Sequence, residues 1–165
     1  MDAIDLLEQQ HEETLQMLTT LKESSPGRER NETFKKLQRS LLAHMVIEEE
    51  LFYPAVVTRS SDGEPIAEGY EEHSGARVAL LRCSRALKQE ELFQVRIGVL
   101  KEMINHHVKE ERESILPRAR ETMPAEEREA LGMEMETRFQ KAMRSNASAD
   151  LNRKSTAREL RALSA

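Results

Sequence analysis

One phrase occurs twice in this chain of 165 residues, and the second copy begins 63 residues after the first. "HMVIEEELFYP" begins at His44 and "HVKEERESILP" begins at His107, and both continue with a glutamate four residues on and a proline ten residues on. Residues four apart lie on one face of an α-helix, so each phrase can direct an imidazole and a carboxylate at one point. A duplicated phrase of this kind predicts a fold made of two matching halves.

The match between the halves extends to the apolar residues that would form a core. When the phrases are superimposed, three further pairs coincide: Leu37 with Leu100, Leu41 with Ile104, and Phe52 with Ile115. Upstream of the phrases, His11 and His73 stand 62 residues apart, almost the same offset. Each half is therefore predicted to be a helical hairpin, with one histidine on its first helix and the H-x3-E pair on its second.

Apolar residues recur at helical spacing in four segments, separated by "SSPGRERN" at 24–31, "SSDGEP" at 60–65 and a short polar break near 89. The predicted helices are residues 3–23, 32–57, 66–88 and 91–120. Amphipathic helices with short connections pack antiparallel around one core. We therefore expect an all-α, up-down-up-down four-helix bundle.

The character of the sequence changes after Pro124. "PAEEREALGMEMETRFQKAMRS" has a narrow apolar stripe and predicts a fifth helix over 124–144. We expect residues 1–122 to form the bundle and residues 123–165 a helical extension, with the last ~20 residues disordered or dependent on a partner for helix formation. Residues 124–165 are the segment through which we expect a homodimer or another protein partner to be contacted.

Charge and cysteine content exclude several classes of function. The chain has 30 acidic and 25 basic residues, a net charge of -5, which gives no electrostatic basis for binding nucleic acid or an anionic membrane. Cys83 is the one cysteine, so no intramolecular disulfide can form and a reducing compartment is indicated. No secretory signal is recognisable and no apolar run reaches the ~20 residues of a transmembrane helix, so we expect a cytoplasmic protein.

Both H-x3-E pairs share the phase of the apolar stripe, which directs them into the bundle. A buried carboxylate is costly unless a positive group compensates it, and a bound cation would do so. A single H-x3-E is weak evidence, because an exposed His/Glu pair on a charged helix is common. Here four of the five histidines stand at corresponding positions on four helices, which predicts a metal site rather than a metal-free helical interaction protein. Its candidate ligands are His11, His44, Glu48, His73, His107 and Glu111.

The series His11, "HMVIE" at 44–48, His73 and "HVKEE" at 107–111 resembles the hemerythrin HHE cation-binding family across residues 5–120. The resemblance implies a four-helix bundle holding two non-haem iron ions, oxo- or hydroxo-bridged, although manganese or zinc also suits such ligands. It implies that Glu48 and Glu111 bridge the metals and that the four histidines are terminal ligands. Dioxygen, peroxide or nitric oxide are the small ligands expected at such a centre.

Two departures from the oxygen-carrying hemerythrins change the expected function. Arg77 stands where those carriers have a further histidine one turn after the third-helix ligand, and a guanidinium is a poor ligand because it stays protonated. The carboxylate of the fourth helix is Glu111, four residues after His107, where the carriers have an aspartate at the fifth position. Simple oxygen carriage is therefore not expected. Catalase-like or ferroxidase activity, or iron and oxygen sensing reported through the C-terminal extension, fits better.

Several residues near the candidate ligands need separate interpretations. Tyr70 lies one turn before His73, where its phenol would reach the metals or pack as an aromatic at the edge of the core. Arg77 would balance the carboxylates of the centre or, more simply, form a salt bridge at the bundle edge. Glu49 and Glu72 point about 100° away from their ligand neighbours, so we expect them on solvated faces. His106 is expected at the surface or in the outer surroundings of the site.

Overall fold

The structure is a computed structural model that describes residues 1–59 and 63–145. Every regular element in these two ranges is helical, so the predicted all-α class is confirmed. The polar end of the chain, for which we expected disorder or partner-dependent helix, lies outside the described residues. Within the described ranges, no helix is both long enough and apolar enough to cross a lipid bilayer.

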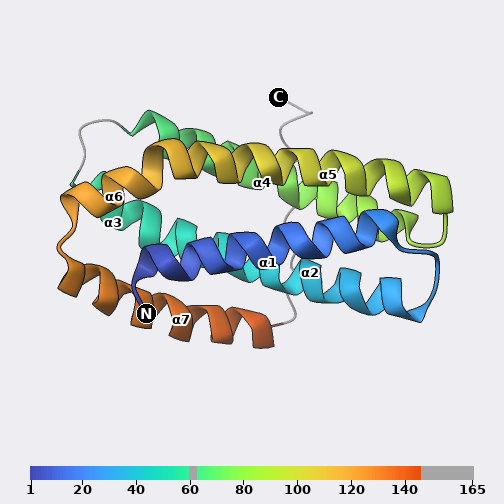
Figure 1. Cartoon of the computed structure of the whole chain (residues 1–165), viewed down its shortest axis with the longest axis horizontal. Helices are drawn as coiled ribbons and strands as arrows, with labels where there is room; N and C mark the ends of the chain where they lie inside the picture. The colour runs from blue at the N-terminus through green and yellow to red at the C-terminus, as the bar shows by residue number, and fades with distance from the viewer. Residues whose placement is uncertain (60–62, 146–165) are drawn as a thin grey trace, which may run out of the picture.

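Four long helices form the bundle, and two of them continue through a π-helical turn into a short helix. The elements in chain order are α1 (Ala3–Glu23), α2 (Arg28–Ile47), the π-helical turn η1 (Glu48–Phe52), α3 (Tyr53–Val57), α4 (Glu64–Ala86), α5 (Glu90–Glu110), the π-helical turn η2 (Glu111–Ile115), α6 (Leu116–Thr122) and α7 (Ala125–Arg144). The α2-η1-α3 rod and the α5-η2-α6 rod are the second helices of the two predicted hairpins (Figure 1).

The helices pack in the cyclic order expected of an up-down-up-down bundle. α1 contacts α2 and α5, and α4 contacts α5 and α2, so each hairpin packs against the other along its length (Figure 1). The second helix begins at Arg28, earlier than the expected residue 32. Arg30 accounts for this, because its buried guanidinium bonds to Ser24 and to both carboxylate oxygens of Glu90, at 2.7 and 2.9 Å. This pairing ties the start of α2 to the start of α5.

The apolar interior is divided into two clusters along the bundle axis. One cluster surrounds Leu37, Phe34 and Phe93 and includes Leu41, Ile104 and Val108. The other surrounds Leu7, Ile47 and Phe52, at the end of the bundle that contains α3 and α6. The candidate ligands on α1, α2, α4 and α5 lie in the layer between these clusters. Each polar side chain is therefore shielded from solvent by hydrocarbon on both sides along the axis.

The expected fifth helix is present as α7, which lies along α1 and α2 (Figure 1). Met135 of α7 is fully buried and belongs to the second apolar cluster. Gly132 lets α7 approach the start of the chain, because a Cβ there would lie 2.2 Å from the carbonyl oxygen of Met1. Arg128 of α7 also bonds to the Asp2 carboxylate at 2.7 Å. The helix is thus packed into the bundle rather than projecting from it.

Candidate metal centre

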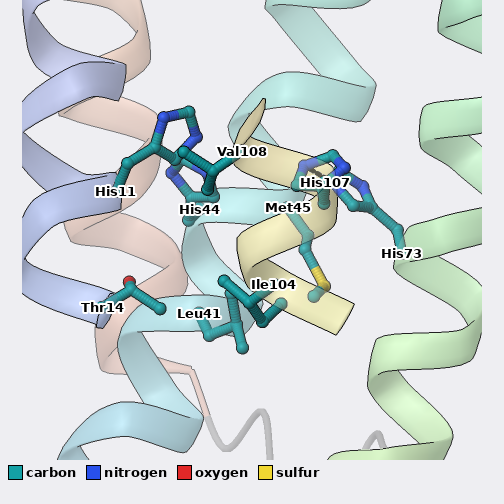
Figure 2. Close-up of a pocket in the computed structure, with 9 residues that line it drawn as sticks. All are labelled: His11, Thr14, Leu41, His44, Met45, His73, Ile104, His107 and Val108. Atoms are coloured by element: carbon teal, nitrogen blue, oxygen red, sulfur yellow. Dashed lines mark hydrogen bonds between the residues drawn. The ribbon is translucent and has the colours of Figure 1, made fainter. Parts of the chain in front are cut away.

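All six candidate ligands come together inside the bundle, and none is more than 4 % exposed. His11 comes from α1, His44 from α2, His73 from α4 and His107 from α5, while the two glutamates open η1 and η2. Figure 2 shows the four imidazoles in one layer above Leu41 and Ile104, with His11 on one side and His73 on the other. The sequence repeat has therefore been folded into a site in which each helix of the bundle contributes one imidazole.

The imidazoles form two similar pairs. The ring centroids of His11 and His44 are 4.8 Å apart at an interplanar angle of 72°. Those of His73 and His107 are 4.7 Å apart at 60°. Each pair joins one histidine from the first helix of a hairpin with one from the second helix of the same hairpin. The two matching halves predicted from the sequence are thus visible in the geometry of the rings.

Glu48 lies between the two pairs and faces both. Its Oε1 atom is 3.1 Å from Nε2 of His44 and 3.7 Å from Nε2 of His11, and its Oε2 atom is 3.2 Å from Nε2 of His73. The donor atoms form two groups, each compact enough to hold one metal ion. One group is His11, His44 and Glu48, and the other is Glu48, His73 and His107. One carboxylate therefore belongs to both candidate metal positions.

Glu111 lies opposite Glu48 and has a different pattern of contacts. Its Oε2 atom is 3.0 Å from Nε2 of His11 and 3.8 Å from Nε2 of His107, so this one oxygen faces both pairs. Its Oε1 atom instead accepts a hydrogen bond from the Tyr53 hydroxyl at 2.7 Å. Glu111 thus presents one oxygen to the centre, where Glu48 presents two.

The centre contains more buried polar atoms than the protein itself satisfies. Within the described part of the chain, both oxygens of Glu48, Oε2 of Glu111, Nε2 of His44 and both ring nitrogens of His11 form no hydrogen bond of normal geometry, although the carboxylate oxygens lie 3.0–3.2 Å from imidazole nitrogens. Buried polar groups are ordinarily paired, so such a cluster needs another species to compensate it. Imidazole nitrogens with carboxylate oxygens are the donor set of iron, manganese and zinc sites. The residues present therefore fit a pair of metal ions.

Protonation of the histidines compensates the carboxylates when no ion is bound. Burial lowers the pKa of His11, but Glu111 and Glu48 outweigh burial and raise it to about 9. His73 behaves alike: burial is outweighed by Glu48 and Glu49, which raise its pKa to about 9. Burial would raise the pKa of Glu48, but His44, His11 and His73 hold it well below its usual range. Burial lowers the pKa of His44. Two buried imidazolium groups, His11 and His73, thus supply the positive charge that bound metal ions would replace.

Comparison with known proteins agrees with this geometry. A family model described as the hemerythrin HHE cation binding domain matches residues 2–119. The chain belongs to this family. The family match covers both hairpins and all six candidate ligands, so the predicted resemblance is confirmed and the HHE bundle is a metal-binding domain.

A solved structure and a curated protein are similar to this HHE chain. The crystal structure of a hemerythrin HHE cation binding domain-containing protein from Mycobacterium kansasii has a TM-score of 0.79 and 24% identity, covering 93% of this chain and 98% of that one. It shows the same fold. A DNA nickase from Nostoc sp. (strain PCC 7120 / SAG 25.82 / UTEX 2576) is 25% identical over 129 residues, 78% of this chain. That alignment spans 36% of the nickase.

Three of the four HHE histidines have their second ring nitrogen held by a neighbouring helix. Nδ1 of His44 lies 2.7 Å from Oε1 of Gln10, Nδ1 of His73 lies 2.9 Å from Oε1 of Glu49, and Nδ1 of His107 lies 2.7 Å from Oε2 of Glu72. Oxygen acceptors at Nδ1 place the proton there and leave the Nε2 lone pair directed at the centre. These outer partners therefore fix the orientation that a metal ligand requires.

The expectation that Glu49 and Glu72 occupy solvated faces was wrong. Each does point away from the ligand on its own helix, but it reaches the imidazole on the next helix of the bundle. Their side chains are 23 % and 25 % exposed. An angular offset on one helix cannot exclude a contact with another helix, and Gln10 was overlooked for the same reason. All three precede or follow a ligand by one residue, which is the pattern that could have revealed them.

The structure separates the roles expected for Tyr70 and Arg77. The Tyr70 side chain is 39 % exposed, and its hydroxyl donates to the backbone carbonyl of Glu49 at 3.1 Å. The phenol that reaches a candidate ligand is that of Tyr53, which was not among the predicted site residues. Arg77 forms a 2.6 Å ion pair with Glu49, the salt-bridge role considered for it, and so supports His73 at one remove. His106 lies at the surface with its side chain 65 % exposed.

Tyr53 reaches the centre because of the π-helical turn that precedes it. Its backbone N–H bonds to the carbonyl of Glu48, five residues earlier, and Leu116 bonds in the same way to Glu111. In an α-helix the residue five places on lies about 140° around the axis, whereas the wider turn returns it toward the same face. Gly69 on α4 leaves room for the ring, since a Cβ there would lie 2.9 Å from the Tyr53 hydroxyl. Burial raises the pKa of Tyr53 well above its usual range, so the phenol remains a donor.

Two hollows adjoin the imidazole layer. A cavity of about 10 Å³ lies among the four histidines and is closed by apolar side chains that include Leu41, Met45 and Val108 (Figure 2). A larger pocket of about 160 Å³ lies between α4 and α5 and is lined by Glu72, His73, Ala76, Met103, Ile104, His106 and His107. The inner cavity has room for one water-sized molecule. The outer pocket connects the His73 and His107 side of the centre with exposed residues.

Proposed function

We propose that this chain binds two iron ions and uses them to bind dioxygen or a related small ligand, namely peroxide or nitric oxide. The observation that carries the proposal is the buried layer of four imidazoles and two carboxylates with unpaired donor atoms between two apolar clusters. His11 and His44 would hold one ion, His73 and His107 the other, and Glu48 would contact both. A bound iron pair supplies redox chemistry toward dioxygen or peroxide.

The surrounding residues suit turnover of a small oxidant. The apolar walls formed by Leu41, Met45 and Val108 exclude bulk water from the imidazole layer. The protonated Tyr53 phenol holds Glu111 in place. We propose catalase-like peroxide decomposition, in which one peroxide is reduced to two water molecules and a second is oxidised to dioxygen. The alternative is oxidation of ferrous iron to ferric iron, with dioxygen or peroxide as the electron acceptor. Because Arg77 stands where the oxygen-carrying hemerythrins have a further histidine, the His73 side would offer a metal one imidazole fewer, which favours such chemistry over simple oxygen carriage.

Metal analysis after anaerobic loading with ferrous iron tests the proposal directly. We expect about two irons per chain, visible absorption that changes on peroxide addition, and dioxygen release measured with an oxygen electrode. His107→Ala should lose metal. His106→Ala is the matched control, because His106 is the adjacent histidine and its side chain is exposed. Equal iron content in both variants and wild type would argue that the buried cluster is not the binding site. Bound iron without peroxide turnover would remove the catalytic part and keep the ligand-binding part.

We do not extend the nickase activity of the Nostoc relative to this chain. The alignment covers 36% of that protein, and the net charge of -5 on this chain provides no attraction for the phosphate backbone of DNA. We propose neither nucleic acid nor membrane as a partner.

A sensing module is a second candidate because α7 is linked to the centre. Arg138 of α7 bonds to both carboxylate oxygens of Glu50, at 2.6 and 2.8 Å, and Glu50 lies in the same π-helical turn as Glu48. A change in the position of Glu48 on metal binding would therefore also move Glu50, the residue that binds Arg138 of α7. Hydrogen exchange of α7 in metal-free and iron-loaded protein tests this role. Identical exchange in the two states would count against it.

A further inference from the structure

The sequence repeat relates the outer partners of the histidines as well as the histidines themselves. Gln10 and Glu72 stand 62 residues apart, the offset of His11 and His73, and they make the same contact to the second-helix histidine of their hairpin. Glu49, which supports His73, corresponds at the 63-residue offset to Arg112. The two halves therefore use the same positions to surround the imidazoles but fill them with different chemistry.

At both pairs of equivalent positions, the more negative side chain lies beside the imidazoles of His73 and His107. In the half that holds His73 and His107, each imidazole donates to a carboxylate, at 2.9 and 2.7 Å. In the other half, His44 donates to the neutral amide of Gln10. Arg112 cannot accept a proton from an imidazole, and Nδ1 of His11 has no hydrogen-bond partner among residues 1–59 and 63–145.

Nearby cations do not cancel this asymmetry. Arg77 pairs with Glu49 at 2.6 Å and neutralises part of its charge. Among residues 1–59 and 63–145, Glu72 is paired with His107 at 2.7 Å and with His106 at 3.5 Å, and with no arginine. On the other side, Arg112 pairs with Glu8 and Glu12 at the bundle surface, at 2.7 and 2.6 Å. Glu8 and Glu12 therefore compensate Arg112, and in the described part of the chain the ion pairs of His11 and His44 are formed with Glu48 and Glu111 instead.

A carboxylate behind an imidazole raises the basicity of the ligating nitrogen, and losing such a partner lowers metal affinity by about 10–100-fold. An amide makes a weaker, uncharged hydrogen bond. Glu49 and Glu72 are both partly buried, so solvent screens them less than it would a surface charge. The two positions consequently differ in their attraction for a cation, although each has two imidazoles and an oxygen of Glu48.

We propose that the two metal positions are inequivalent and fill in a fixed order, with the first ion bound by His73 and His107. This rests on the proposed function only in requiring that the six-residue cluster binds metal. The His73 position has the higher affinity by at least about tenfold, the lower end of the effect of one outer carboxylate. Because Glu48 belongs to both positions, the first ion lies within a few ångströms of the second and repels it. This repulsion increases the difference between the two binding affinities. Protein with one ion per chain therefore holds it on the α4 and α5 side.

Zinc titration of the metal-free full-length chain tests the order without any enzymatic readout. Imidazole resonances of protein carrying 15N-labelled histidine, assigned with single histidine variants, report which rings coordinate. At one equivalent we expect the His73 and His107 signals to shift while those of His11 and His44 remain at their metal-free positions. Calorimetry should resolve two steps whose dissociation constants differ at least about tenfold.

The repeat supplies matched variants that change charge and nothing in shape. Glu72→Gln should weaken the first step by about tenfold or more, because it gives His107 the amide partner that His44 already has. Gln10→Glu should strengthen binding at His11 and His44 by a similar factor. The double variant exchanges the two side chains and should bring the two steps together or reverse them.

Three results would overturn parts of the proposal in distinguishable ways. Two equal steps, or first occupancy of His11 and His44 in the wild-type chain, would refute the fixed order while leaving metal binding intact. An unchanged order in the double variant would show that Gln10 and Glu72 do not set it. Absence of zinc and of ferrous iron binding would instead refute the proposed function itself.

Discussion

At the scale of single residues, Tyr53 distinguishes the two glutamates of the centre. Its hydroxyl bonds to Oε1 of Glu111 at 2.7 Å, and its ring stacks on His73 with centroids 5.7 Å apart. The residue at the equivalent position of the second half is Leu116, which has no hydroxyl to offer Glu48. One carboxylate is thus held by a phenol while both oxygens of the other face the imidazoles.

Replacement of Tyr53 with phenylalanine should destabilise the metal-free chain. The change leaves Oε1 of Glu111 buried without its donor, which costs about 1–3 kcal/mol. For a chain of this size we expect the midpoint of thermal unfolding to fall by roughly 2–10 °C. Tyr70→Phe is the control, since the Tyr70 side chain is 39 % exposed and should change stability little. Equal losses in the two variants would show that the bond to Glu111 contributes nothing.

Cys83 should be chemically inert in the folded chain. The side chain is fully buried in the first apolar cluster, and burial raises the pKa of the thiol to about 12. At pH 8 the folded protein therefore contains almost no thiolate, the form that reacts with alkylating reagents. Iodoacetamide labelling followed by mass spectrometry should show modification only after denaturation. Rapid labelling of the native chain at this pH would contradict the packing described for α4.

The sequence predicted the residues that share a face but not the residues that meet across faces. His44 with Glu48 and His107 with Glu111 followed from helical spacing and duplication. Glu72 and Tyr53 did not, because their contacts depend on which helix lies next to which and on a local change of helical pitch. Such contacts are properties of the assembled bundle, which a periodicity along one segment does not contain.

At the scale of elements, each of the two rods contains a π-helical turn that the helical periodicity of the sequence did not predict. Residues 32–57 and 91–120 were expected to be uninterrupted α-helices, whereas η1 and η2 interrupt them directly at Glu48 and Glu111. Phe52 and Tyr53 are adjacent and both fully buried, an arrangement that one narrow face of an α-helix does not readily provide. The prolines at 54 and 117 lie just past these turns and have no N–H to continue the α-helical bonding.

The pocket between α4 and α5 should control access of small ligands to the iron-loaded centre. Met103 lines this pocket beside His107, so Met103→Ala widens it and should accelerate azide or nitric oxide binding severalfold in stopped-flow measurements. Val99→Ala is the control on the same helix, because Val99 is 55 % exposed and is not among the residues that line the pocket. Ala76→Leu fills the pocket and should slow binding. Rates that are the same in all three variants would place the access route elsewhere.

At the scale of the whole molecule, α7 completes the core instead of forming a separate appendage. Its approach to the first residues of the chain depends on Gly132, and its Met135 enters the apolar cluster that contains Leu7 and Ile47. The expected boundary near residue 122 therefore separates segments that pack together. Contact of residues 124–165 with a second copy of the chain or with another protein stays a prediction.

Gly132→Ala should weaken this packing. The added Cβ would lie 2.2 Å from the carbonyl oxygen of Met1 and 2.9 Å from the backbone nitrogen of Ala3, so α7 must move away from the chain start. The lost contacts should outweigh the gain of about 1 kcal/mol that alanine has over glycine in a helix. Gly98→Ala is the control, because there the Cβ meets only the flexible end of Lys22. Thermal unfolding should show a lower midpoint for the first variant and an unchanged or higher one for the second.

The polar layer between the two apolar clusters should also determine how the bundle unfolds. Without metal, the hydrocarbon contacts that transmit cooperativity along a bundle are interrupted at the level of Glu48 and Glu111. We therefore expect the two ends of the metal-free bundle to open as separate units, which amide exchange would detect as two distinct protection levels. Ions bound to ligands from α1, α2, α4 and α5 would join these units, since opening either end would have to break metal–ligand bonds. The metal centre would in this way convert two weakly coupled folding units into a single one.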